Sequence, residues 1–162
     1  MRDAAKWFVL SVLIVVVDQL TKYVAVLHLT GKSIEVTSFF NLVLVYNPGA
    51  AFSFLSDAAG WQRGLFIAIA LIASAWIVYL LGRYPHQRLF ALSLSLVLAG
   101  AVGNVIDRIH AGAVIDFLDF HALGYHWPAF NVADSAISCG AALLIWDALR
   151  PRRSRNLDAR IP

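Results

Sequence analysis

Four long hydrophobic segments constrain this chain more than any other feature of its sequence. They cover residues 7–27, 64–81, 89–106 and 133–149. Crossing the hydrocarbon core of a bilayer takes about 20 mostly apolar residues in a helix, and each segment approaches that length. Because lipid offers no hydrogen-bond partner to backbone N–H and C=O groups, a segment that crosses it must be helical. The sequence therefore predicts four transmembrane helices, with long connections at 28–63 and 107–132.

The composition supports a membrane protein and argues against a soluble domain. Hydrophobic residues make up 60% of the 162 residues and charged residues only 14%, whereas soluble domains carry about 25% charged residues. The length suits one membrane-embedded domain over residues 1–162. The single cysteine, Cys139, excludes an internal disulfide and a multi-cysteine metal site, and we expect a packed apolar thiol.

The first segment could also be interpreted as a secretory signal peptide, because Arg2 and Lys6 precede its apolar run. No small-residue cleavage site follows, and the apolar character resumes after Lys22. Three further segments make the chain an integral membrane protein under either interpretation.

The distribution of basic residues predicts the orientation in the membrane. Nine of the 13 Lys and Arg residues lie in the two termini and the 82–88 connection, and four lie elsewhere. Because basic loops stay in the cytoplasm, both termini should be cytoplasmic and the two long connections should lie outside. The arginine cluster at 150–155 is interpreted as a topology signal, and no nucleic-acid partner is expected.

The first long connection has the composition of a small β element. Residues 33–47, SIEVTSFFNLVLVYN, are rich in β-branched and aromatic residues, and Asn47-Pro48-Gly49 predicts a turn. Aromatic side chains of this connection suit the membrane interface: Phe39, Phe40, Tyr46, Phe52, Phe54 and Trp61. The predicted fold class is an all-α polytopic membrane protein with four transmembrane helices and a small periplasmic β element between the first two.

Five carboxylates are expected to converge toward the outer leaflet. They are Asp18, Asp107, Asp116, Asp119 and Asp134. An aspartate at the centre of a membrane helix costs about 2.5–3.5 kcal/mol on insertion scales, so a purely structural protein has little reason to carry several. Simpler interpretations remain open for some of them.

Each simpler interpretation has its own local reason. Asp18 and Lys22 are four residues apart and could form an ion pair on one helix face. Asp107 and Arg108 could pair at a helix end, and Asp134 could favour a positive helix N-terminus. Asp116 is harder to explain in this way, because it lies in the apolar stretch VIDF with no adjacent base.

Two carboxylates held close together cannot both stay ionised, so they share a proton, as in aspartic proteases. The charged member activates water and the protonated member polarises the scissile carbonyl. Spacing alone does not choose a pair among the five.

Other catalytic motifs are missing from the sequence. HExxH and GxSxG motifs are absent, and His110, His121 and His126 lack ligand-like spacing, so no metal or cofactor is expected.

Five motifs in chain order resemble those of bacterial lipoprotein signal peptidase, also called signal peptidase II. They are DQLTK at 18–22, YNPGAAFS at 46–53, GNVIDR at 103–108, VIDF at 114–117 and FNVADSAI at 130–137. The resemblance implies a membrane-embedded aspartic endopeptidase with its active site toward the periplasmic face of the inner membrane. Its substrates would be diacylglyceryl-modified prolipoproteins, cut just before the lipidated cysteine.

The resemblance also assigns residues. The catalytic dyad maps onto Asp116 and Asp134. The supporting and substrate-binding positions map onto Asp18, Lys22, Asn47, Asn104, Asp107, Arg108 and Asn131. Membrane lipids are further expected partners, a monomer is expected, and the 28–63 connection could act as a lid over the substrate.

Two rival hypotheses about function rest on the residues alone and not on the family resemblance. A proton-coupled transporter or channel would use intramembrane aspartates as a relay. The cytoplasmic halves of the four segments carry no ionisable residue except Asp147 near the edge, which argues against a path through the membrane. A non-enzymatic scaffold subunit would tolerate the loss of Asp116 or Asp134.

Overall fold

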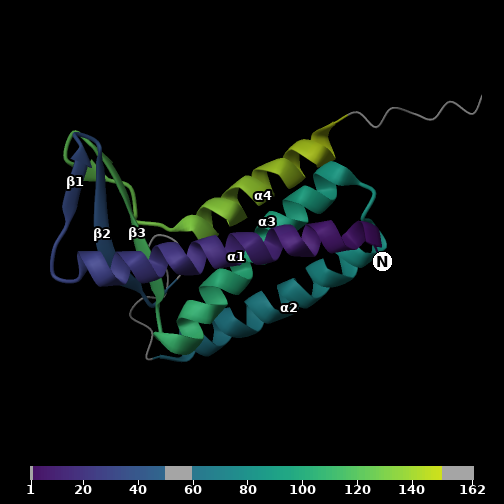
Figure 1. Ribbon diagram of the computed structural model, residues 1–162, viewed down its shortest axis with the longest axis horizontal. Coiled ribbons are helices and arrows are strands. Elements are labelled where there is room, and N and C mark those ends of the chain that lie inside the picture. Colours follow the sequence, from purple (N-terminus) through teal and green to yellow (C-terminus); the bar gives the residue numbers. More distant parts are fainter. Residues whose placement is uncertain (1, 50–59, 151–162) are drawn as a thin grey trace, which may run out of the picture.

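The computed structural model describes residues 2–49 and 60–150. Its long helices are α1 (Arg2–Leu29), α2 (Trp61–Arg83), α3 (Arg88–His110) and α4 (Val132–Leu149). Each is long and apolar enough to cross a membrane. The predicted polytopic fold with four such helices is therefore confirmed, and α2 and α3 form the antiparallel pair expected from their short connection (Figure 1).

The helices extend beyond the segments that hydropathy marks. The difference that bears on the site lies in α3, which was predicted to end at residue 106 but continues to His110. Asp107 and Arg108 are therefore helical rather than part of the outer connection. A segment predicted from hydropathy ends at the first charged residue, whereas the helix itself can continue wherever its polar side chains find partners.

The third helix is the centre of the bundle. Within its apolar window 56% of residues are buried, against 22% in α1, 11% in α2 and 17% in α4. Small residues allow the close approach of α3 and α4, since a Cβ on Gly140 would lie 2.7 Å from the Ser93 carbonyl oxygen. The other helices surround α3 and turn most of their apolar surface outward.

Four antiparallel strands form a sheet at the end of the bundle where α1 ends and α4 begins (Figure 1). The order is β1 (Ile34–Thr37), β2 (Phe40–Asn47), β3 (Val114–Ala122) and β4 (Tyr125–His126). The strands of the first connection were predicted, but β3 and β4 lie in the second connection and were not. The pairing of β2 with β3 joins the two long connections into one sheet.

The exposure of Cys139 and of the aromatic side chains bears on two of the predictions. Cys139 was expected to be packed, but it is exposed, because α4 buries the side that carries Ala133, Ala136 and Gly140. Of the predicted interfacial aromatic residues, Phe39, Tyr46 and Trp61 are exposed. Phe52 and Phe54 lie outside the described residues, as do most of the arginine cluster and part of the predicted lid.

Candidate active site

Asp116 projects from β3 and is 2% exposed. Two asparagine side chains hold its carboxylate. The Asn131 Nδ2 group donates to Oδ1 at 2.7 Å, and the Asn47 Nδ2 group donates to Oδ2 at 3.3 Å. Asn47 closes β2 and Asn131 precedes α4, so three elements far apart in the sequence meet at this carboxylate.

Asp134 lies in the first turn of α4 and is half-buried. Asn131 is the N-cap of this helix, and its Oδ1 accepts the backbone N–H of Asp134 at 2.8 Å. The Asn104 Nδ2 group of α3 donates to Asp134 Oδ1 at 2.8 Å. Asn131 is therefore the residue that contacts both Asp134, through the helix cap, and Asp116.

The orientation of each asparagine amide follows from what its oxygen accepts. Because Asn131 Oδ1 caps α4, its NH₂ group is left to face Asp116. Because Asn104 Oδ1 accepts the Lys22 Nζ group at 3.0 Å, its NH₂ group is left to face Asp134. The two amides also contact each other at 3.4 Å. Both carboxylates thus receive N–H donors whose direction is set by the fold.

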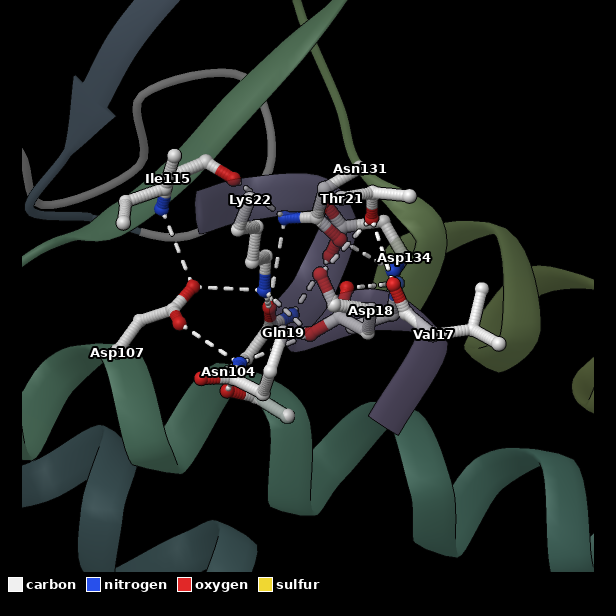
Figure 2. A network of polar contacts seen from close by, with 12 residues as sticks. Val17, Asp18, Gln19, Thr21, Lys22, Asn104, Asp107, Ile115, Asn131 and Asp134 are labelled. Atoms are coloured by element: carbon white, nitrogen blue, oxygen red, sulfur yellow. Dashed lines mark hydrogen bonds and ion pairs between the residues drawn. The ribbon is translucent and has the colours of Figure 1, made fainter. Parts of the chain in front are cut away.

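Lys22 is the centre of the surrounding polar network (Figure 2). It is 1% exposed, and its ammonium lies 2.8 Å from Asp18 Oδ2 and 2.6 Å from Asp107 Oδ2. The Asp18–Lys22 pair foreseen from the sequence therefore exists, but it is one part of a triad that links α1 to α3. Two buried carboxylates around one cation leave excess negative charge, which hydrogen bonds must balance.

Those hydrogen bonds come from all sides of the network. Asp18 Oδ1 accepts the backbone N–H of Ala133 at 2.8 Å, which ties α1 to α4. Asp107 Oδ2 accepts the backbone N–H of Ile115 at 3.2 Å, which ties α3 to the strand that carries Asp116 (Figure 2). The triad therefore fixes both elements that carry the two aspartates.

Arg108 and Asn47 connect the network to the turn after β2. The Asn47 Oδ1 atom accepts the Gly49 N–H at 3.0 Å, and the Arg108 guanidinium donates to the Gly49 carbonyl at 2.8 Å. The guanidinium also lies 5.0 Å from the centre of the Phe66 ring. The predicted turn at Asn47-Pro48-Gly49 thus positions Asn47 against Asp116. Arg108 reaches this turn, while the adjacent Asp107 contacts Lys22.

The environment of Asp116 favours its protonated form. Burial and the nearby charge of Asp134 raise the pKa of Asp116 to about 7, and hydrogen bonds from Asn47 and Asn131 and the charge of Lys22 only partly oppose this rise. A carboxyl with a pKa near neutrality can both accept and return a proton at physiological pH. Such a shift beside a second carboxylate is the property that proteases with paired aspartates use.

Comparison with known proteins identifies the family. The sequence profile described as Signal peptidase (SPase) II matches residues 10–150. The chain belongs to the signal peptidase II family. It is 59% identical to a Cupriavidus necator protein named lipoprotein signal peptidase, over 145 residues that cover 89% of this chain and 83% of the relative. A Burkholderia thailandensis protein of the same name is 57% identical over 148 residues, with 90% and 89% covered.

Two solved structures of bacterial membrane enzymes share this fold. A bacterial membrane enzyme determined by the in meso method at 2.3 Å resolution superposes with a TM-score of 0.81 at 32% identity, covering 98% of this chain and 95% of that one. A second, at 1.9 Å, gives 0.79 at 34% identity, with 91% and 95% covered. With the family profile and the named relatives, the chain is a membrane peptidase, which argues against the transporter and scaffold hypotheses.

One of the five carboxylates of this signal peptidase II is bound elsewhere on the sheet. Asp119 contacts His126 Nδ1 at 2.8 and 3.0 Å and accepts from Asn41 Nδ2 at 3.1 Å. Burial alone would raise the pKa of Asp119, but these hydrogen bonds and the nearby histidines hold it below its usual range. Neighbouring strand residues alternate between faces, so Asp119 faces away from Asp116, three positions earlier. It stabilises the sheet.

Sequence reasoning missed Gln19 and Gly103. The Gln19 amide donates to Asp107 Oδ1 at 3.0 Å, to Asp18 Oδ2 at 3.1 Å and to the Gly103 carbonyl at 3.2 Å. A Cβ on Gly103 would lie 2.6 Å from Asp18 Oδ2. Both residues lie inside motifs quoted above, Gln19 beside Asp18 and Gly103 beside Asn104, and that adjacency was the available signal.

Proposed function

We propose that this signal peptidase II uses Asp116 and Asp134 as a catalytic dyad to cleave diacylglyceryl-modified prolipoproteins just before the lipidated cysteine. The observation that carries the proposal is that Asn131 contacts both aspartates, through its Nδ2 to Asp116 and through its Oδ1 to the backbone of Asp134. The pKa of about 7 at Asp116 supports a dyad that holds one proton at neutral pH.

The reaction needs one water and no other reactant. The ionised carboxylate removes a proton from water as its oxygen attacks the carbonyl carbon of the residue before the cysteine. The protonated carboxyl gives its proton to the carbonyl oxygen. As the tetrahedral intermediate collapses, the cysteine nitrogen takes a proton from the dyad, the C–N bond breaks, and one hydroxyl of the intermediate returns its proton to the dyad as the carbonyl re-forms. The products are the signal peptide and a lipidated N-terminal cysteine, and the dyad again holds one proton.

The supporting residues act on the dyad rather than on the peptide bond. Asn104 and Asn131 donate to the two carboxylates, and the Lys22 triad with Asp18 and Asp107 fixes Asn104 and the start of α4. Asn47 and Arg108 connect Asp116 to the turn after β2. These contacts support the positioning roles that the motif resemblance implies.

The proposed location is the bacterial inner membrane, with one domain, both termini in the cytoplasm and the dyad near the periplasmic surface. Two observations support it: the basic residues cluster at the termini and the 82–88 connection, and Asp116 and Asp134 lie where the sheet meets the bundle. We expect a monomer that needs no cofactor or nucleic acid. A lid role for 28–63 depends partly on residues outside the described ranges.

The deciding experiment measures cleavage of a lipidated precursor by the purified protein in detergent. Asp116→Asn and Asp134→Asn should each abolish cleavage while thermal unfolding still shows a folded protein. Asp119→Asn is the matched control, because it removes a carboxylate from the same strand but outside the proposed dyad. Normal turnover by both dyad variants would refute the assignment.

A second measurement tests the substrate class. The same precursor without its diacylglyceryl group should be a poor substrate. Equal cleavage rates for the two forms would contradict the proposed requirement for the lipid.

A further inference from the structure

An apolar groove lies between the outer end of α1 and the sheet. Its volume is about 370 Å³, within the range of about 300–1,000 Å³ typical of ligand sites. Side chains from α1 and three strands line it: Val24, Ala25, Leu29, Ile34, Leu42 and Phe117. Ala25, Leu29 and Phe117 are buried and form its floor, whereas Val24 and Ile34 are exposed at its edge.

The groove is separate from the proposed catalytic site. Phe117 follows Asp116 in β3, and successive side chains of a strand point to opposite faces. The carboxylate of Asp116 points toward Asn131 and Asn47, while Phe117 packs against Ala25 and Leu29 of α1. A peptide bound at the dyad would therefore lie on the other side of β3 from the groove.

The groove is continuous with the surface that α1 turns outward along its length. Exposed apolar side chains of α1 follow one another toward the groove: Val9, Val12, Leu13, Val16, Val17, Leu20, Tyr23, Val24 and Leu27. In a helix that crosses a bilayer such a surface faces lipid. Leu20 and Val24, which are 58% and 52% exposed, belong both to this surface and to the groove. The groove therefore opens onto acyl chains.

We propose that the groove binds one fatty acyl chain of a bilayer phospholipid. Apolar side chains line its wall, as suits an acyl chain, and two basic side chains follow at the end of α1. His28 lines the groove in the last turn of α1, and Lys32 is exposed in the turn that follows. A lipid phosphate can lie beside these groups. Glu35 follows Ile34 in β1, so its side chain points away from the groove.

The bound chain would support the strand that carries Asp116. It would contact Phe117 on one face of β3, while Asn131 and Asn47 hold Asp116 on the other. The groove thus extends the proposed function by giving the surrounding bilayer a contact with the strand that bears the dyad. The binding itself does not depend on that function.

The test is photo-crosslinking of the full-length protein in nanodiscs of phosphatidylglycerol that carries a diazirine near the end of one acyl chain. We expect crosslinks within residues 20–42 that exceed those on the lipid-facing side of α2, where Ile72 is 71% exposed. Val24→Trp should fill the groove and lower these crosslinks to the level seen on α2, because the side chain occupies the space that the acyl chain would take. Val16→Trp, on the same surface but outside the groove, should leave them unchanged.

Three outcomes would overturn the proposal. The first is crosslinking in the groove no stronger than on α2, and the second is equal crosslinking in the Val16→Trp and Val24→Trp proteins. The third is labelling of the groove by a diazirine on the diacylglyceryl group of a precursor but not by phosphatidylglycerol, which would assign the groove to the substrate. If Val24→Trp does not fold, Leu20→Trp replaces it. The same crosslinks are expected in the Asp116→Asn protein, so a failed dyad assignment is distinguishable from a failed lipid site.

Discussion

Replacing Lys22 with methionine would leave two buried aspartates without their shared cation. The ammonium lies 2.8 Å from Asp18 and 2.6 Å from Asp107, and each of the three side chains is at most 2% exposed. Methionine has nearly the length of the lysine stem, so the substitution removes the charge with little change in volume. The two remaining carboxylates would stay buried without the cation that they share.

The expected loss of stability is large. Removing one partner of a buried ion pair costs about 3–5 kcal/mol, because the other charge stays buried and uncompensated. Two carboxylates share this cation, so we expect a loss near the upper end, about 4–5 kcal/mol. For a chain of this length that corresponds to a fall in Tm of roughly 10 °C.

Activity should change in a way that a structural loss alone does not produce. Lys22 lowers the pKa of Asp116, so its removal should raise that pKa further. More of the dyad would then hold two protons at neutral pH, and the acid limb of the kcat/KM profile should move to higher pH. The assay is precursor cleavage across pH at a temperature where the variant is folded.

A charge-balanced variant provides the control. Lys22→Met combined with Asp18→Asn and Asp107→Asn removes the cation and both charges that it neutralises, and it should recover much of the lost Tm. A Lys22→Met protein with the wild-type Tm and the wild-type pH profile would refute this account of the triad.

Two further predictions follow from the same network. Gly103→Ala should lower the free energy of unfolding by about 1–3 kcal/mol, as overpacking does, because its Cβ would lie 2.6 Å from Asp18 Oδ2 and 3.2 Å from the Ala133 Cβ. Gly64→Ala is the control and should not destabilise the protein, since a Cβ there meets nothing within 4 Å. Equal losses in both variants, measured by thermal unfolding, would contradict the packing argument. Asp116→Asn should remove a pH dependence of stability: the pKa of Asp116 is raised from 3.8 to about 7, so the folded state binds the proton more tightly and loses up to about 4 kcal/mol as pH rises between these values. Unfolding measured at pH 4 and pH 8 checks this, and an unchanged slope in the variant would exclude Asp116 as its source.

The helices were predictable because their signal is local. An uninterrupted apolar run such as 64–81 can cross lipid only as a helix, whatever the rest of the chain does. The strand β3 was not predictable in the same way. Its stretch VIDFLDF needs β2 as a partner, and Asp116 pairs with Val45 across a large separation in the sequence. Hydropathy does not report such pairing.

The candidate site likewise has features that the sequence predicts and features that only the fold determines. The motifs identified the residue types and the family, and the helix directions placed all five aspartates toward one end of the bundle. Which carboxylates share partners depended on geometry: the alternation of β3 turns Asp119 toward His126, and the extension of α3 brings Asp107 to Lys22.

Membrane insertion and the identity of the charged groups follow from the order of residues along the chain, because apolar length and residue type are properties of each segment alone. The grouping of Asp116 and Asp134 around Asn131, the direction of the asparagine amides and the groove beside Phe117 arise only when distant segments meet. Hydrogen-bond direction and cavity shape are properties of several segments together, so only the folded chain sets them.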